Sequence, residues 1–173
     1  MQVLGTFDLG DTPAVTAHRV DRHVYIGGYL AARDAQWARR EGIGSVVKLF
    51  ADDDVDRRLR LPGVVYTVVA ADDVPSYDMR GAVMTAMRAI DAARARDEKV
   101  LVHCHMGISR SATIVLMYLM LRKHMTLAEA YAYLKSVRDV IRPNEGFMRL
   151  LATTDRQLKE KRRRGQAPTA TRR

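Results

Sequence analysis

The chain has 173 residues, a length that fits one domain with its own hydrophobic core. Apolar residues make up 47%, an ordinary globular value, and no apolar run is long enough to cross a bilayer. Lysine and arginine outnumber aspartate and glutamate by 29 to 20, but few aromatic residues and no nucleic-acid-reading motif accompany this excess. We therefore expect no membrane span, and nucleic acid is not an expected partner.

In chain order, the N-terminal segment 1–18 has little periodicity, and we interpret it as an extended lead-in. Hydrophobic patterns then predict strands and helices in alternation, with turn residues between them. The expected strands are 20–27, 45–50, 64–69 and 100–102, and the expected helices are 29–40, 79–96, 112–123, 126–138 and 143–161. This alternation predicts an α/β fold with a central mixed, mostly parallel sheet flanked by helices.

The segment 159–173 is rich in lysine and arginine, and we interpret it as a flexible, solvated tail that follows a domain at 19–158. A nuclear localisation patch and a contact with acidic surfaces are the alternatives. The single cysteine, Cys104, excludes an internal disulfide and favours a reducing compartment. We therefore expect a cytoplasmic protein, with the nucleus as the alternative.

The stretch Val-Leu-Val-His-Cys-His-Met-Gly-Ile-Ser-Arg-Ser-Ala-Thr at 100–113 contains this cysteine. An apolar run before it predicts a buried strand, and the apolar pattern after it predicts a buried helix. Residues 104–110 must then turn from the strand into the first turn of the helix. Backbone N–H groups at such a turn have no intrahelical partner, and together with the helix dipole they form a binding site for an anion.

Four residues of this segment suit attack on a phosphate ester. Gly107 allows a backbone conformation that a side chain would resist. Arg110 follows the cysteine by six residues, and its planar guanidinium can hold two phosphate oxygens. The positive environment favours the nucleophilic thiolate form of Cys104. The Ser111 hydroxyl can donate to that sulfur and stabilise it as a leaving group.

The neighbouring residues have supporting assignments. We expect His103 to orient the loop through hydrogen bonds rather than to transfer protons. His105 and Met106 are expected at the floor or the rim of the pocket. The residues expected to surround the phosphate are His105, Met106, Gly107, Ile108, Ser109 and Arg110. Five histidines and one cysteine show no metal-ligand spacing, so we expect neither a metal nor another cofactor.

The pattern His-Cys-(five residues)-Arg-Ser resembles the signature loop of cysteine-dependent protein phosphatases, and HCHMGISRSAT is similar to the dual-specificity branch. The resemblance covers 20–151. Besides the loop it includes Val24-Tyr25-Ile26-Gly27 and the closing residues Arg138, Ile141, Pro143, Asn144 and Phe147. It implies the cysteine-phosphatase fold and a phosphoprotein substrate. It also implies hydrolysis of phosphotyrosine, phosphoserine and phosphothreonine through a cysteinyl-phosphate intermediate.

Cleavage of a phosphate ester also needs a proton for the departing oxygen, which a carboxylic acid on a separate loop can supply. The loop after the predicted strand 64–69 carries Asp72 and Asp73 at the same sheet edge as the cysteine. The resemblance points to Asp73, because relatives carry the acid at closely similar spacing, and Asp72 is the alternative. Asp78 fits better as a cap of the helix that follows.

Two other functions remain open from the sequence. The first is a phosphatase of a phosphoinositide or an RNA 5′ phosphate. In the family that this chain resembles, lipid-phosphate relatives tend to carry lysines inside the loop, and RNA-directed relatives commonly follow the arginine with Thr-Gly. Here the variable loop residues carry no strong cation and Ser-Ala follows the arginine, so the resemblance favours a protein substrate. The second is a catalytically inactive module that binds phosphoproteins. The presence of Cys104, Arg110, Ser111 and a candidate acid argues against it.

Overall fold

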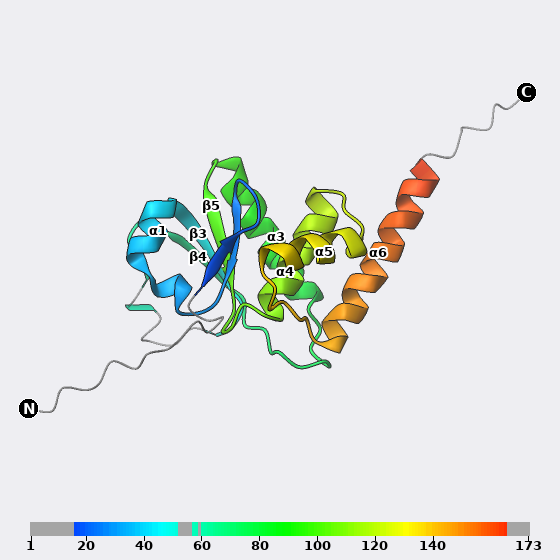
Figure 1. Cartoon of the computed structure of the whole chain (residues 1–173), viewed down its shortest axis with the longest axis horizontal. Coiled ribbons are helices and arrows are strands. Elements are labelled where there is room, and N and C mark those ends of the chain that lie inside the picture. The colour runs from blue at the N-terminus through cyan, green and yellow to red at the C-terminus, as the bar shows by residue number, and fades with distance from the viewer. Residues whose placement is uncertain (1–15, 52–56, 59, 166–173) are drawn as a thin grey trace, which may run out of the picture.

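The strands form one sheet with helices on both sides in the computed structural model, which describes residues 16–51, 57–58 and 60–165 (Figure 1). Within these residues the sheet has five strands in the order β1-β2-β5-β3-β4. Their bounds are β1 (Ala17–Arg19), β2 (Val24–Gly27), β3 (Ile43–Lys48), β4 (Val65–Val68) and β5 (Lys99–His103). Only β1 is antiparallel to its neighbour, and the other pairs are parallel. The predicted mixed, mostly parallel sheet is confirmed.

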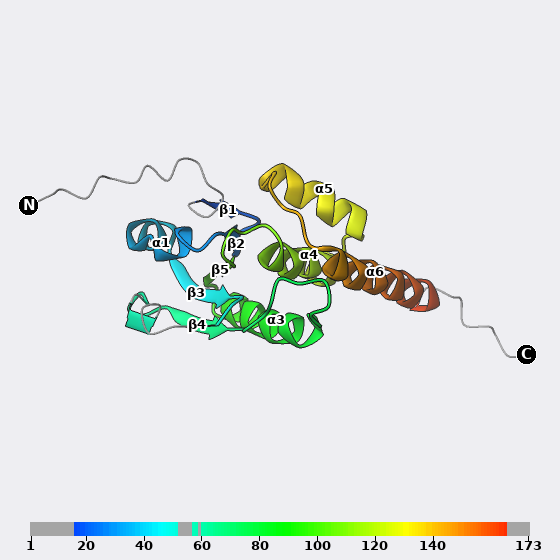
Figure 2. The same cartoon turned by 90° about the horizontal axis from the view of Figure 1, so that it is seen from below.

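Helices cover both faces of this sheet: α1 (Ala35–Glu41) on one side and α3 (Arg80–Ala95) with α4 (Arg110–Arg122) on the other, as Figure 2 shows. Successive side chains of a strand point to opposite faces. In β5, Val100 and Val102 join the large core beneath α3 and α4, whereas Leu101 joins a smaller cluster with Ala38 of α1. Strand β5 is thus buried on both faces, as expected of the central strand of a sheet with helices on both sides.

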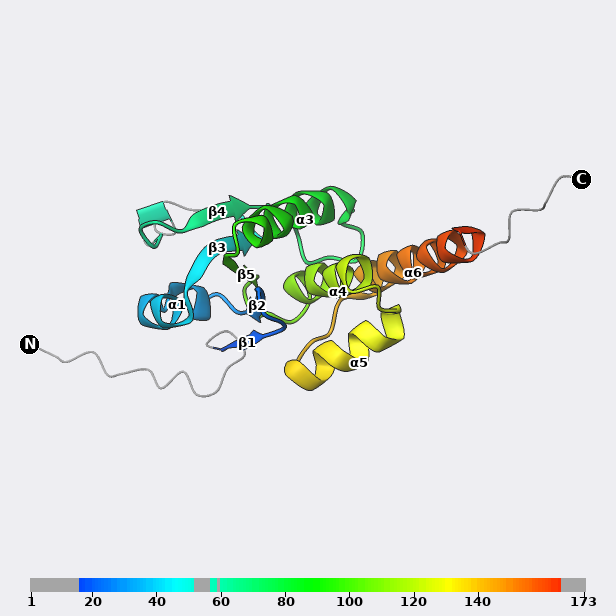
Figure 3. The same cartoon turned by 90° about the horizontal axis from the view of Figure 1, so that it is seen from above.

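Helix α4 is enclosed by the rest of the domain. It packs on β2 and β5, and α5 (Leu127–Val137) and α6 (Glu145–Gly165) pack against it (Figure 3). All of its residues from Arg110 to Met120 are buried. This burial on every side explains why the sequence of α4 is apolar nearly all round. The loop that precedes α4 therefore ends on a rigid support.

The N-terminal part differs from the predicted elements. Ala17 and His18, assigned to the lead-in, lie in β1. The predicted strand 20–27 begins only at Val24, because the Asp21 carboxylate accepts the N–H groups of His23 and Val24 and makes a turn there. The predicted helix 29–40 is a short 3-10 helix, η2 (Ala31–Arg33), followed by α1. The break falls at Asp34, whose side chain caps α1.

The C-terminal helix is longer than predicted. The sequence predicts its end near residue 161, inside a tail assigned to 159–173, but α6 continues to Gly165. The lysines, arginines and glutamate at 159–164 favour helix, and Lys159 pairs with Asp155 one turn earlier at 2.6 Å. The rest of the predicted tail and residues 1–15 lie outside the described residues. None of the helices in the described ranges has both the length and the apolar character to span a membrane.

Candidate active site

The loop 104–110 connects the central strand β5 to α4 at the carboxyl end of the parallel strands (Figure 1). Gly107 has a φ of 68°, and a Cβ there would lie 2.6 Å from the Gly27 carbonyl oxygen. Only glycine fits this position without displacing β2, so the conformational role predicted for Gly107 is confirmed.

The sulfur of Cys104 lies inside the loop. Its Sγ accepts a hydrogen bond from the Gly107 N–H at 3.3 Å and lies 3.3 Å from the Ser111 hydroxyl. Only 2% of Cys104 is exposed, whereas His105 and Met106 stand exposed on the loop above it. Both groups that contact the sulfur can donate a hydrogen bond to it, one from the loop and one from the first turn of α4.

Arg110 is fixed by one end of its guanidinium. Nη1 donates to the carbonyl oxygens of Leu49 at 3.1 Å and Ala71 at 3.0 Å, which follow β3 and β4. Its buried Nε donates no hydrogen bond to any described residue, although it lies 3.4 Å from a carboxylate oxygen of Asp73. The carbonyls therefore orient the side chain, and the Nε edge is left to interact with an anion.

The loop after β4 carries Asp72 and Asp73, and Asp73 is the one whose carboxylate contacts the phosphate loop, residues 104–110. Its Oδ1 accepts hydrogen bonds from the Ser109 hydroxyl at 2.6 Å and from the Asn144 side chain at 3.0 Å. Within the described ranges, no hydrogen bond or ion pair joins Asp72 to the loop. Asp78 lies farther along the chain, where its carboxylate accepts the backbone N–H of Arg80, the first residue of α3. The predicted cap is not formed as expected, because Met79 rather than Asp78 is the N-cap residue of that helix.

Asn144 joins three parts of the site. Its Nδ2 donates to Asp73, its backbone N–H donates to the Ser109 hydroxyl at 3.2 Å, and its Oδ1 accepts the Phe147 N–H at 3.0 Å. The last bond caps the start of α6. Sequence pattern did not predict the contact between Asn144 and Asp73, because the two residues are remote along the chain.

Arg138 supports the phosphate loop from behind, a role that the sequence did not reveal. Although only 1% exposed, it donates through Nε to the Gly107 carbonyl and through Nη2 to the Met106 carbonyl, both at 2.8 Å. Burial lowers the pKa of Arg138, while the charges of Cys104 and Asp139 act in the opposite direction. An arginine at the end of a predicted amphipathic helix usually faces water, so local pattern did not distinguish it.

The two histidines beside Cys104 both contact the Phe50 ring, but one is buried and the other is exposed. The buried His103 ring lies with Nδ1 3.3 Å from the Cys104 carbonyl oxygen and meets the Phe50 ring edge-on. The His105 ring stacks on Phe50 at 3.9 Å between centroids. Because His105 and Met106 are exposed, the structure places them at the rim of the site rather than at its floor.

The fold and this site together define a class of protein. A cysteine that ends a central parallel strand, a loop wound round its sulfur, an arginine on the following helix and a carboxylate facing that arginine are the parts of a cysteine-dependent phosphatase. The comparisons with known proteins agree with this class and narrow it.

The family model "Dual specificity phosphatase, catalytic domain" matches residues 24–157. Dual specificity protein phosphatase 26 of Homo sapiens is 38% identical over 154 residues, covering 87% of this chain and 72% of that protein. Dual specificity protein phosphatase 13B of Mus musculus is 37% identical over 142 residues, covering 79% and 71%. The crystal structure of human DUSP28 is similar with a TM-score of 0.77 at 28% identity, covering 86% of this chain and 99% of that chain. The chain belongs to the dual specificity phosphatase family and is a phosphatase.

Proposed function

We propose that this phosphatase hydrolyses phosphotyrosine, phosphoserine and phosphothreonine in proteins through a cysteinyl-phosphate intermediate. One observation carries the proposal: the Cys104 sulfur, the Ser111 hydroxyl and the arginine Nε edge belong to a single loop and helix start. Family membership supports a protein substrate, since both sequence relatives are named as protein phosphatases.

In the first step, the Cys104 thiolate attacks phosphorus in line with the bond to the departing oxygen. A sulfur–phosphorus bond forms as the phosphorus–oxygen bond breaks, and Asp73 donates a proton to the leaving oxygen. Asp73 suits this role because Ser109 and Asn144 hold its carboxyl beside the loop.

In the second step, water attacks the cysteinyl-phosphate and Asp73, now a carboxylate, accepts a proton from that water. The sulfur leaves as a thiolate, and the Ser111 hydroxyl at 3.3 Å stabilises it. Inorganic phosphate is the second product. The proton that Asp73 gave in the first step is thereby restored, so the cycle balances.

Arg110 and the loop act on the phosphoryl group in both steps. Since Nη1 is bound to two carbonyl oxygens, the guanidinium is oriented before the substrate arrives. Phosphoryl transfer requires little covalent chemistry from the protein, so most of the acceleration comes from positioning and from fixed charges of this kind.

The test is to capture the intermediate. Wild-type protein quenched in acid during turnover of a phosphotyrosyl peptide should carry one phosphate on Cys104, detected by mass spectrometry of the peptide. Cys104→Ser should form no such adduct and should lose turnover by a factor on the order of 10⁴ or more. Phosphoseryl and phosphothreonyl peptides, a phosphoinositide and a 5′-phosphorylated RNA complete the substrate panel.

Two results would contradict the proposal. One is turnover without phosphate on Cys104. The other is a clear preference for the lipid or the RNA over every phosphopeptide. Alkylation by iodoacetate checks access to the buried sulfur: the native protein should react at Cys104, and inorganic phosphate should slow that reaction.

A further inference from the structure

A groove of about 670 Å³ lies beside the phosphate loop, and the proposed chemistry uses only one wall of it. Asp73, Ile108 and Ser109 form the wall nearest the reaction. The groove is also lined by Arg142, which precedes α6, and by Glu145, the first residue of that helix. A peptide whose phosphate reaches the sulfur must continue over the surface next to the loop, and this groove is a path for it.

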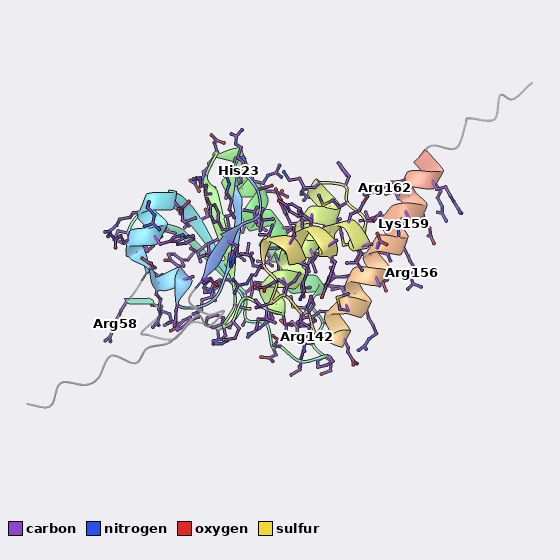
Figure 4. The ribbon with its side chains drawn as sticks, in the orientation of Figure 1. His23, Arg58, Arg142, Arg156, Lys159 and Arg162 are labelled. Carbon is purple, nitrogen blue, oxygen red and sulfur yellow. The ribbon has the colours of Figure 1, made fainter. Side chains whose placement is uncertain are left out.

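Arg142 is coupled to the phosphate loop through its backbone. Its N–H donates to the Ile108 carbonyl at 2.9 Å, so its Cα has a fixed place beside the loop. Figure 4 shows Arg142 at the edge of the molecule opposite His23, the residue before β2, and thus at the carboxyl end of the parallel strands. The side chain is exposed and makes no hydrogen bond or ion pair with any described residue.

The other charges on the groove are already engaged or point outward. The Asp73 carboxylate accepts from Ser109 and Asn144 and faces Arg110. The Glu145 side chain is 89% exposed and lies 3.9 Å from Arg149, one turn along α6. Among the residues that line the groove, Arg142 is therefore the cation whose charge the described part of the protein does not use.

We propose that Arg142 selects phosphopeptides that carry a carboxylate side chain next to the phosphorylated residue. The inference rests on the proposed function, because it assigns the groove to the substrate chain that flanks the reacting phosphate. A planar guanidinium can pair with a carboxylate through two parallel hydrogen bonds. Because Arg142 is exposed, the gain is that of a surface ion pair, about threefold to fivefold in kcat/KM.

The experiment compares phosphotyrosyl peptides that differ only in Glu against Gln, placed at each of three positions on either side of the phosphotyrosine. The quantity measured is the ratio of kcat/KM for the Glu peptide to that for the Gln peptide, which cancels any general loss of activity. Wild-type protein should give a ratio of about 3 to 5 at one or two positions. Arg142→Ala should bring this ratio to about 1, and Arg142→Lys should keep most of it.

Two further variants sharpen the assignment. Arg156→Ala is the matched control, since Arg156 is also exposed but lies farther along α6, does not line the groove and contacts Thr153 rather than a groove carboxylate, and it should keep the wild-type ratio. Glu145→Gln removes a negative charge from the groove and should raise the ratio. All these substitutions keep the backbone N–H at position 142 that bonds to the loop.

The outcomes separate this inference from the proposed function. Turnover of a small aryl phosphate with ratios near 1 at every position would overturn the role of Arg142 and leave the phosphatase function standing. An equal loss of the ratio in Arg142→Ala and Arg156→Ala would also overturn it, because general surface charge would then be the cause. No turnover of any phosphate ester by wild-type protein would contradict both proposals together.

Discussion

The phosphate loop and the acid loop of this protein, residues 104–110 and 70–78, are held in different ways. The phosphate loop is fixed from inside the domain, where Arg138 binds its carbonyl groups and α4 continues from it as a buried helix. The acid loop is largely exposed, and side-chain bonds from Ser109 and Asn144 hold its key carboxyl. The nucleophile is therefore built into the core, whereas the acid is attached at the surface, so substitutions should separate their two roles.

Among the substitutions that separate the two loops, Asp73→Asn should reduce the rate of hydrolysis the most. The asparagine keeps a similar shape but cannot donate the proton, so hydrolysis of alkyl phosphates and poor aryl leaving groups should fall by about 10²- to 10⁴-fold. Leaving groups that need no proton, such as dinitrophenolate, should lose much less. A series of aryl phosphates of graded leaving-group acidity measures this difference.

Asp72→Asn is the control for that series. Asp72 adjoins Asp73 but has no hydrogen bond to the phosphate loop among the described residues. Its rates should stay near those of the wild type for every leaving group. If Asp72→Asn instead gave the steep dependence, the acid would be Asp72, and the side-chain contacts of Asp73 would serve structure only.

The two loops also differ in how far sequence could predict them. The contacts of Cys104 with Gly107 and Ser111 join near neighbours, so a local pattern was enough to place the sulfur beside Ser111 and to predict the special backbone conformation of Gly107. The capping box at Thr126 and Glu129 was predictable for the same reason. Such features are set by a few consecutive residues.

The supporting contacts were not predictable, because they join remote parts of the chain. Arg138 reaches Gly107 from the end of α5, and Asn144 reaches Asp73 from the start of α6. Nothing in the sequence around either residue indicates its partner. The strand β1 is a similar case: its three residues become a strand only because β2 offers an edge for pairing.

A pair of glycine substitutions should separate the contributions of the two loops to catalysis. Gly107→Ala would place a side chain at positive φ against the Gly27 carbonyl, so the whole phosphate loop must shift. Turnover should fall for good and poor leaving groups alike, by about 10²-fold, with a loss of about 2 kcal/mol in the free energy of unfolding. Steady-state kinetics and denaturant unfolding measure the two losses.

Gly146→Ala is the matched change at the acid loop. A Cβ at Gly146 would overlap the Pro75 carbonyl, so the acid loop must move away from α6 while the phosphate loop keeps its contacts. Hydrolysis of poor leaving groups should fall about tenfold, and good leaving groups should be nearly unaffected. Equal losses for both kinds of leaving group would mean that the two loops move together, against the separation inferred here.

The smallest effect on catalysis is expected from a change to Asp21, which precedes β2 at the amino end of the parallel strands. Burial raises the pKa of its carboxyl, but hydrogen bonds from Lys123, Tyr118 and two backbone N–H groups outweigh burial and bring the pKa down to about 2. The folded protein thus favours the charged form relative to the ordinary value of 3.8. Asp21 should contribute about 2 kcal/mol of stability above that ordinary value, which is lost as the pH falls toward 2.

Asp21→Asn should therefore lower the free energy of unfolding at neutral pH and flatten its dependence on pH between about 4 and 2. Urea unfolding at several pH values measures both changes. Asp21 lies at the amino end of the strands, away from both loops. While it is folded, the variant should therefore keep the wild-type dependence of the hydrolysis rate on the leaving group. A changed leaving-group dependence would show that a substitution at one end of the strands alters the geometry of the site at the other end. In that case the losses in the glycine and Asp73 variants could not be assigned to one loop alone.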